Sequence, residues 1–170
     1  RVIGHEAAGT VVEAGEGVSD LKEGDQVCLM PCIKCKKCRA CEKGQTNACK
    51  SLELYGVHRD GSLQEYLNAP AENWIKISGD ARPEEIAMLE PLTIGCHAAA
   101  KLGLKPGDRV LVMGAGPIGV SCALNAKTYG AEVILADISA QRRRFVSEQF
   151  ELDVLDPVSY DYNSTIQRIT

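Results

Sequence analysis

The first seventy residues alternate short apolar runs with glycine-containing turns, a pattern typical of β-strands. A β-branched run at 11–18 and an apolar run at 26–30 are separated by a Gly24-Asp25 turn. Asp60-Gly61 favours a hairpin turn between the short runs 55–58 and 63–67. Strands of this length and spacing predict a small barrel-like β domain, with the segment 31–50 inserted into it.

Beyond residue 80 the apolar positions recur at nearly four residues instead of two, which predicts helices. Proline and acidic residues open a helix at Pro83. Glu90-Pro91 is expected to end it, and residues 92–102 are expected to form a second, alanine-rich helix packed inside. Strands are then predicted at 109–113, 132–136 and 152–155, and helices at 118–129 and 141–149. This alternation predicts a parallel sheet, with the first strand buried.

A glycine-rich turn, Gly114-Ala115-Gly116-Pro117-Ile118-Gly119, lies between the first of these strands and its helix. Such glycines allow a tight turn and let a pyrophosphate approach the helix N-terminus. Asp137 follows the second strand, where an acid can bind both hydroxyls of a ribose. A glycine-rich turn of an unrelated βαβ unit would not explain Asp137. The pattern therefore predicts NAD binding by Gly114, Gly116, Pro117, Ile118, Gly119 and Asp137.

Three arginines, at 142, 143 and 144, follow Asp137. Arginine in this place can hold the 2′-phosphate of NADP, whereas an aspartate repels it. The aspartate favours NAD, and Arg142 is included in the candidate nucleotide site. All three arginines begin five residues beyond Asp137 on a predicted helix, where they are expected to cover the adenine or to face solvent.

Four cysteines, Cys35, Cys38, Cys41 and Cys49, follow one another at gaps of three, three and eight residues. Four thiolates on short turns can close a tetrahedral shell around zinc that leaves no position for a substrate, so the predicted site is structural. Free or disulfide-bonded cysteines are the alternative, but CxxCxxC spacing is more typical of a metal site. The other cysteines are interpreted as a bystander, Cys32, and as buried thiols, Cys28, Cys96 and Cys122.

The composition, 170 residues with 45% hydrophobic and 25% charged, is that of an ordinary globular protein. A net charge of −4 argues against a nucleic-acid partner. The basic residues around the four cysteines are therefore expected to be a solvated surface, with a zinc-knuckle nucleic-acid module as the alternative. No signal-peptide pattern and no apolar run of about 18 residues is present, so we expect a cytoplasmic protein with no membrane partner.

A second metal site is suggested by His5-Glu6, which precedes a predicted strand, and by Glu90, which stands at a helix break. A carboxylate in such a place needs a partner or a cation if it is buried. A surface turn and a helix cap are the respective alternatives. His97 is interpreted as a packed core residue, and His58 has no assigned role.

In this order, the β domain, the four cysteines, the His-Glu pair, Glu90-Pro91-Leu92 and the nucleotide turn resemble the zinc-dependent medium-chain dehydrogenases over residues 1–137. The Gly4-His5-Glu6 motif, Glu90 and the stretch GVHRDG at 56–61 are most similar to the polyol and sugar-acid branch. The resemblance implies an α/β plus β fold. Its parts are a partial GroES-like catalytic domain at 1–101 and a partial, doubly wound Rossmann NAD-binding domain at 102–170.

The resemblance also implies an activity, the oxidation of a secondary alcohol of a polyol, sugar acid or hydroxy amino acid with hydride transfer to NAD. His5 then binds a catalytic zinc, Glu6 lies in or next to its shell, and Glu90 replaces a cysteine of the alcohol dehydrogenases. A carboxylate makes a harder site, suited to oxygen-rich substrates. The full-length enzyme is expected to be a dimer or tetramer. A non-catalytic relative that keeps only the nucleotide and one zinc is the competing hypothesis.

Two counts lead to the expectation that the chain is an internal fragment. A doubly wound domain has about six strands, of which at most three are predicted here. The remaining zinc thiolate of the family would lie upstream of Gly4-His5-Glu6. We expect the isolated chain to hold about one zinc, in the four-cysteine site, and to show no turnover.

Overall fold

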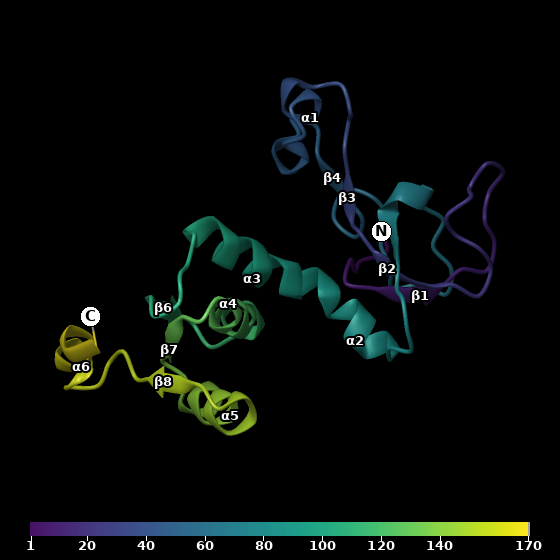
Figure 1. Cartoon of the computed structure of the whole chain (residues 1–170). Helices are drawn as coiled ribbons and strands as arrows, with labels where there is room; N and C mark the ends of the chain where they lie inside the picture. Colours follow the sequence, from purple (N-terminus) through teal and green to yellow (C-terminus); the bar gives the residue numbers. More distant parts are fainter. Residues whose placement is uncertain (170) are drawn as a thin grey trace. The chain divides into compact units, whose positions relative to one another are not determined.

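The computed structural model describes residues 1–169, which form two compact units (Figure 1). The first unit is Arg1–Glu90 and the second is Pro91–Thr170. Helix α3 (Leu89–Leu102) begins two residues before this division. The domain limits expected from the sequence, 1–101 and 102–170, stay a prediction.

The first unit contains an antiparallel sheet of β1 (Ala8–Thr10), β2 (Gln26–Leu29) and β5 (Trp74–Lys76), in the order β1-β2-β5. The central strand β2 carries the apolar run predicted from the sequence, and its last three residues are buried. Ala8 lies opposite Cys28, and Leu29 lies opposite Trp74. The sheet thus aligns residues near the N-terminus with the end of β2.

The cysteine lobe, residues 32–54, leaves this sheet on a neck made of β3 (Cys32–Ile33) and β4 (Glu53–Leu54), which pair antiparallel. Between them lie the short helices α1 (Arg39–Glu42) and η1 (Thr46–Ala48) (Figure 1). Buried Asn73, at the end of η2 (Ala71–Asn73), donates through its amide to the carbonyls of Met30 and Cys32 at 2.7 and 3.0 Å. This amide fixes the neck to the main sheet.

Two strand predictions in this unit are wrong. The run 11–18 is a loop, and the strand in this region is β1, three residues earlier. The hairpin expected around Asp60-Gly61 does not form in the described residues either. The N–H groups of residues 61, 62 and 63 donate instead to the carbonyls of Val2, Gly4 and Ile3. This segment satisfies its backbone against the start of the chain, which sequence spacing alone could not indicate.

The helix pair begins where it was predicted, with α2 at Pro83–Ala87. The side chain of Glu85 accepts from the backbone N–H of Arg82 at 3.0 Å, which caps the helix N-terminus. The expected break at Glu90-Pro91 is wrong, because the chain turns at Met88 and Pro91 lies in the first turn of α3. Proline fits there since the first N–H groups of a helix have no partner within it.

Helix α3 is not packed inside on all sides, as its alanine-rich sequence suggested. It buries one stripe spaced by four residues, Pro91, Gly95 and Ala99. Cys96 and His97 are exposed, so the prediction of a buried Cys96 and of a core His97 is wrong. Cys28 is buried as expected, and Cys122 is partly buried.

The second unit holds three parallel strands, β6 (Arg109–Met113), β7 (Glu132–Ala136) and β8 (Asp153–Leu155), in that order. They alternate with α4 (Pro117–Thr128) and α5 (Ala140–Phe150), and α6 (Tyr162–Ile169) follows. The predicted elements are confirmed to within one or two residues. The predicted burial of β6 is wrong, because Leu111 and Met113 on this edge strand are 41% and 64% exposed.

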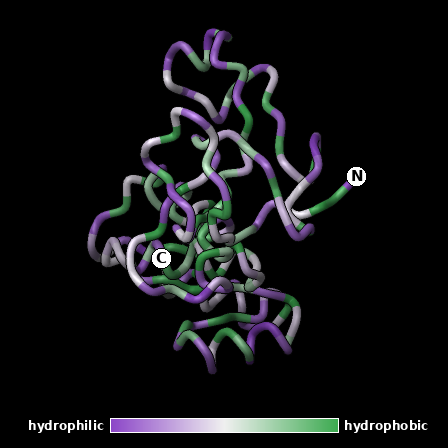
Figure 2. The backbone as a smooth tube through the Cα atoms, turned by 90° about the vertical axis from the view of Figure 1, so that its right-hand side faces the viewer, coloured by the Kyte–Doolittle hydropathy of each residue, from purple (hydrophilic) through white to green (hydrophobic). Residues whose placement is uncertain are grey.

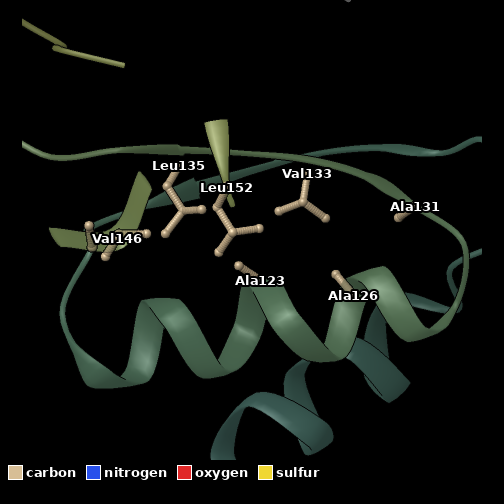
Figure 3. Packing of buried hydrophobic residues seen from close by; sticks show 8 residues of the cluster. Ala123, Ala126, Ala131, Val133, Leu135, Val146 and Leu152 are labelled. Carbon is tan, nitrogen blue, oxygen red and sulfur yellow. The ribbon is translucent and has the colours of Figure 1, made fainter. Parts of the chain in front are cut away.

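The core of this unit lies between the sheet and two helices. Ala123 and Ala126 of α4 face Leu135 and the neighbouring apolar side chains (Figure 3). Their small size lets the helix approach β7 closely. Val146 of α5 is fully buried in the same cluster, so α4 and α5 contribute to one core.

Among residues 1–169, no helix has the length and apolar character needed to cross a membrane. The hydropathy colours change at short intervals along the tube in Figure 2.

Replacing Gly95 with alanine should destabilise the second unit. A Cβ on Gly95 would lie 2.2 Å from the Ser121 hydroxyl and 2.4 Å from its carbonyl carbon, at the contact between α3 and α4. Overpacking of this kind costs about 1–3 kcal/mol, measurable as a lower urea midpoint. Gly15→Ala is the control, because its Cβ would meet open space. Equal midpoints for the two variants would contradict the close helix contact.

Candidate zinc and nucleotide sites

The four cysteines singled out by their spacing come together in the lobe. The sulfur atoms of Cys35, Cys38, Cys41 and Cys49 all lie within 4.8 Å of one another. Cys38 stands at the N-terminus of α1, Cys41 lies within that helix, and Cys49 follows η1 and is buried. Short turns thus gather the four thiols on a lobe with little apolar core of its own.

Backbone N–H groups surround these sulfur atoms. Hydrogen bonds from the backbone of Cys41 and Lys50 lower the pKa of Cys38 to about 6. The backbone N–H of Cys35 donates to Cys49 at 3.4 Å and lowers the pKa of that thiol. Burial raises the pKa of Cys41 to about 12. The lobe therefore favours thiolates at some positions, and a dication would relieve the repulsion among all four.

Lys36 has a backbone φ of 61°, a left-handed conformation that is uncommon outside glycine. It lies between Cys35 and Cys38, and its N–H is directed at Cys41 and lowers the pKa of that thiol against the effect of burial. Such strain is typical of a site that needs one defined geometry. The donor set and the N–H groups fit a tetrahedral zinc ion.

A second group of candidate ligands lies in the main body of the first unit. One nitrogen of His5 and one carboxylate oxygen each from Glu6 and Glu90 lie within 4.8 Å of one another. His5 and Glu90 are partly buried, and Glu6 is exposed. His5 and Glu90 are 85 positions apart in the chain, yet the fold brings them together. One nitrogen and two oxygens could hold a metal and leave a coordination position open.

Glu90 lies in the first turn of α3, and the preceding helix α2, which packs against β1 and β2, brings it to this place. The carbonyl of buried Ile86, in α2, accepts a weak hydrogen bond from the thiol of Cys28 at 3.4 Å. Cys28 is the residue opposite Ala8 in the sheet, so the same strand pair also positions His5 and Glu6. Burial raises the pKa of the Cys28 and Cys32 thiols, and the negative charge of Glu90 raises it further.

Sequence reasoning missed the residues that hold the segment before His5. A Cβ on Gly56 would lie 2.4 Å from the Gly4 carbonyl oxygen, and one on Gly61 would lie 2.1 Å from it. The Asp60 carboxylate accepts from the N–H of Val2 at 2.9 Å. The signal was present in the stretch GVHRDG, but Gly61 was interpreted as a turn residue and Gly56 as part of a strand. They allow a close backbone contact with Gly4 instead.

In the second unit, the glycine-rich turn connects β6 to α4. Gly114 has a φ of 106°, which favours glycine, and a Cβ on Gly119 would lie 1.8 Å from the Gly114 carbonyl oxygen. Gly116 precedes the helix, with Pro117 and exposed Ile118 in its first turn. Side chains at Gly114 and Gly116 would meet open space, so one side of the turn is accessible. The turn fits a pyrophosphate at the N-terminus of α4.

The carboxylate of Asp137, predicted to bind a ribose, is itself held by hydrogen bonds within the protein. Its side chain is 5% exposed and accepts from the N–H groups of Ser139 at 2.7 Å and Ala115 at 2.8 Å. These backbone hydrogen bonds lower the pKa of the carboxyl group, and the charge of Arg142 at 3.8 Å lowers it further. Ala115 belongs to the glycine-rich turn, so this carboxylate joins the ends of β6 and β7. Each of its oxygens keeps a lone pair for a further donor.

The comparisons with known proteins agree with this division. Residues 1–79 match the alcohol dehydrogenase GroES-like domain. Residues 94–169 match the C-terminal domain of alanine dehydrogenase and PNT.

Among relatives, the chain is 42% identical to the L-galactonate-5-dehydrogenase of Escherichia coli K12, over 98% of this chain and 49% of the relative. It is 40% identical to the L-idonate 5-dehydrogenase of Vitis vinifera, over 83% of this chain and 39% of the relative. The chain thus spans about half the length of the curated relatives it matches, or less.

Three solved structures are similar over at least nine tenths of the chain. Galactitol-1-phosphate dehydrogenase from Escherichia coli has a TM-score of 0.89 at 28% identity, with 99% of this chain and 50% of that one covered. An alcohol dehydrogenase from Escherichia coli CFT073, complexed with NADH, has a TM-score of 0.89 at 32% identity, over 98% and 50%. A zinc-binding dehydrogenase from Sinorhizobium meliloti bound to NADP has 0.84 at 36%, over 91% and 46%.

The GroES-like match, the Rossmann-type strand order and the similarity to polyol and sugar-acid dehydrogenases along nearly the whole chain lead to one conclusion: the chain belongs to the zinc-dependent medium-chain dehydrogenases.

Proposed function

We propose that the protein containing this chain is a zinc-dependent oxidoreductase that transfers a hydride from a secondary alcohol to NAD. The observation that carries the proposal is the convergence of His5, Glu6 and Glu90 within 4.8 Å. A relative that used zinc only for stability would need the four-cysteine cluster and not a second, partly exposed ligand group. Both ligand groups and a nucleotide turn occur in the same chain.

The cysteine cluster holds the structural zinc in this proposal. Its four sulfur ligands, Cys35, Cys38, Cys41 and Cys49, close the shell and leave no position for a substrate. The cluster stabilises the lobe and takes no part in hydride transfer.

His5, Glu6 and Glu90 form the catalytic group. A zinc ion held there supplies a Lewis acid that lowers the pKa of an alcohol. His5 and Glu90 are the partly buried members of the group and act as ligands. Glu6 is exposed, so its carboxylate can pass the proton of the alcohol to water.

The nucleotide is bound by the turn residues Gly114, Gly116, Pro117, Ile118 and Gly119. Their accessible side receives the pyrophosphate, and α4 adds the positive end of its dipole. The charged and strongly held carboxylate of Asp137 accepts from the ribose hydroxyls and disfavours a 2′-phosphate. Arg142, 63% exposed, can cover the adenine.

The proposed substrates are polyols, sugar acids and hydroxy amino acids. Glu90 gives the metal group an additional hard oxygen donor in place of a soft thiolate, which suits ligands with several hydroxyl groups. Two of the named relatives are dehydrogenases of sugar acids, L-galactonate and L-idonate.

The proposal also covers the setting of the enzyme. All eight cysteines are free, which suits the reducing cytoplasm. The acidic net charge of −4 disfavours nucleic acid, and Lys36 of the lobe is paired with Glu72 at 2.8 Å. We further propose an assembly of two or four copies, which light scattering of the full-length protein tests, and domain limits at 101/102.

The first test is a zinc count on the full-length protein together with a screen of NAD reduction over polyols and sugar acids. We expect two zinc ions per chain and turnover with at least one member of the class. His5→Ala should remove one zinc and the turnover while leaving the fold intact by circular dichroism. One zinc per chain and no turnover would favour the non-catalytic relative.

Cys38→Ser in the full-length protein should remove the other zinc. The hydroxyl is a poor ligand, and the lobe contains few buried apolar side chains to compensate. We expect the zinc content to fall by about one per chain and the melting temperature to fall with it. Cys96→Ser, an exposed thiol outside the cluster, is the control. An unchanged zinc content in the Cys38 variant would contradict the cluster assignment.

Asp137→Ala should weaken NAD binding and improve NADP binding relative to it. The change removes the ribose acceptor and the negative charge that repels a 2′-phosphate. A hydrogen bond to a charged group is worth about 1.5–3 kcal/mol, so we expect the dissociation constant for NAD to rise about tenfold or more. Titration of the bound reduced nucleotides by fluorescence measures both affinities. Tighter binding of NADP than of NAD by the unaltered protein would contradict the proposed preference.

A further inference from the structure

Arg143 differs from its two arginine neighbours. Its side chain is 20% exposed, whereas that of Arg142 is 63% exposed and Arg144 lies at the surface. One guanidinium nitrogen donates to the backbone carbonyl of Asp137 at 2.8 Å, and another pairs with the carboxylate of Asp156 at 2.7 Å. The expectation that Arg143 covers adenine or faces solvent is therefore wrong.

A positive charge at the position of Arg143 in α5 would be unfavourable without the two groups that it binds. It lies in the first turn of the helix, where the N–H of Arg143 donates to the carbonyl of the N-cap residue Ser139. The N-terminal end of a helix carries a partial positive charge, which disfavours a cation there. The Asp156 carboxylate and the Asp137 carbonyl offset this cost. A partly buried arginine at a helix N-terminus therefore suggests a function for its two hydrogen-bonded groups.

Those groups join the carboxyl ends of two neighbouring strands. Asp137 follows β7, and Asp156 follows β8. The N–H of Asp137 donates to the carbonyl of Leu155 at 3.2 Å, beside the bridge made by Arg143. Asp156 is itself held, because its other carboxylate oxygen accepts from the N–H of Val158 at 3.1 Å. The guanidinium group of Arg143 is thus held by a partner on each of the two strand ends.

With the Arg143 contact included, the carboxylate, the backbone N–H and the backbone carbonyl of Asp137 all have hydrogen-bond partners. Its carboxylate accepts from Ala115 and Ser139, its N–H donates to Leu155, and its carbonyl accepts from Arg143. The first three contacts use backbone atoms and are independent of side-chain identity elsewhere. Two contacts depend on side chains, because the carbonyl accepts from Arg143 and the carboxylate pairs with exposed Arg142 at 3.8 Å. Of these two side chains, Arg143 is the one that holds the backbone of Asp137, so the orientation of this residue can be altered at Arg143.

We propose that Arg143 is a positioning residue for nucleotide binding, which holds Asp137 so that its carboxylate meets the 2′-hydroxyl of the adenine-side ribose. The inference rests on the proposed function, because it presupposes that NAD binds at this turn. Arg143 touches no part of the nucleotide itself. It acts through the backbone of Asp137, with Asp156 as its counter-ion.

Arg143→Gln in the full-length enzyme tests this role, with NAD and an NAD analogue that lacks the 2′-hydroxyl of the adenine-side ribose as probes. We expect the dissociation constant for NAD to rise about five- to tenfold, since one charge-assisted hydrogen bond is lost. The constant for the analogue should rise clearly less than the constant for NAD, because one of the two hydroxyl contacts that Arg143 supports through Asp137 is already missing. KM for NAD should rise with kcat nearly unchanged. Arg144→Gln, on the same helix, is the matched control and should leave both constants unchanged.

The charge swap Arg143→Asp with Asp156→Arg separates positioning from stability. It restores an ion pair between α5 and the end of β8 and removes the donor from α5 that meets the Asp137 carbonyl. We expect the urea midpoint to recover while the affinity for NAD stays low. Equal weakening of NAD and the analogue by Arg143→Gln, or no weakening of either, would overturn the inference. Failure of the unaltered enzyme to bind NAD at all would instead contradict the proposed function.

Discussion

The antiparallel pairing of β1 with β2 determines whether the candidate catalytic group can form at all. The register places Ala8 opposite Cys28 and lets the N–H of Leu29 donate to the carbonyl of Ala7, directly after Glu6. Cys28 in turn contacts the Ile86 carbonyl, four residues before Glu90. Side chains alternate between the two faces of a strand, so a slip by one residue would turn Cys28 away from α2 and separate His5 from Glu90.

At two of the candidate sites, the cysteine cluster and Asp137, negative charge is stabilised by backbone N–H groups more than by cationic side chains. In the lobe, N–H groups of residues such as Cys41 and Lys50 stabilise thiolates. In the nucleotide unit, those of Ala115 and Ser139 stabilise the Asp137 carboxylate. Backbone donors are fixed by the fold and lose little entropy on binding, so these charges remain in place without long, mobile side chains.

The elements of the α/β unit and the grouping of the four cysteines could be predicted from the sequence because their signals are local. β7 at Glu132–Ala136 is bounded by a glycine and an acid, and the cysteine spacing is readable within fifteen residues. The segment 55–67 was mispredicted because its hydrogen bonds run to residues 2–4, a pairing between distant residues that leaves no local pattern. The role of Arg143 was missed for the same reason, since Asp156 is thirteen positions away and belongs to another element. Exposed Cys96 and His97 were mispredicted because composition does not show which face of a helix is covered.

The contact of Gly4 with Gly61 closes a loop of the chain that contains the whole cysteine lobe. A metal ion bound by both Cys35 and Cys49 would reduce the effective length of this loop, because the residues between them would be bypassed. Loop-closure entropy depends only logarithmically on length, so this shortening changes the cost of the outer closure by about 0.3 kcal/mol. The lobe and the outer loop closed by Gly4 and Gly61 are thus nearly independent in chain entropy. Such a lobe can therefore change in length during evolution. The change has little effect on the entropic cost of closing the loop that holds the segment before His5.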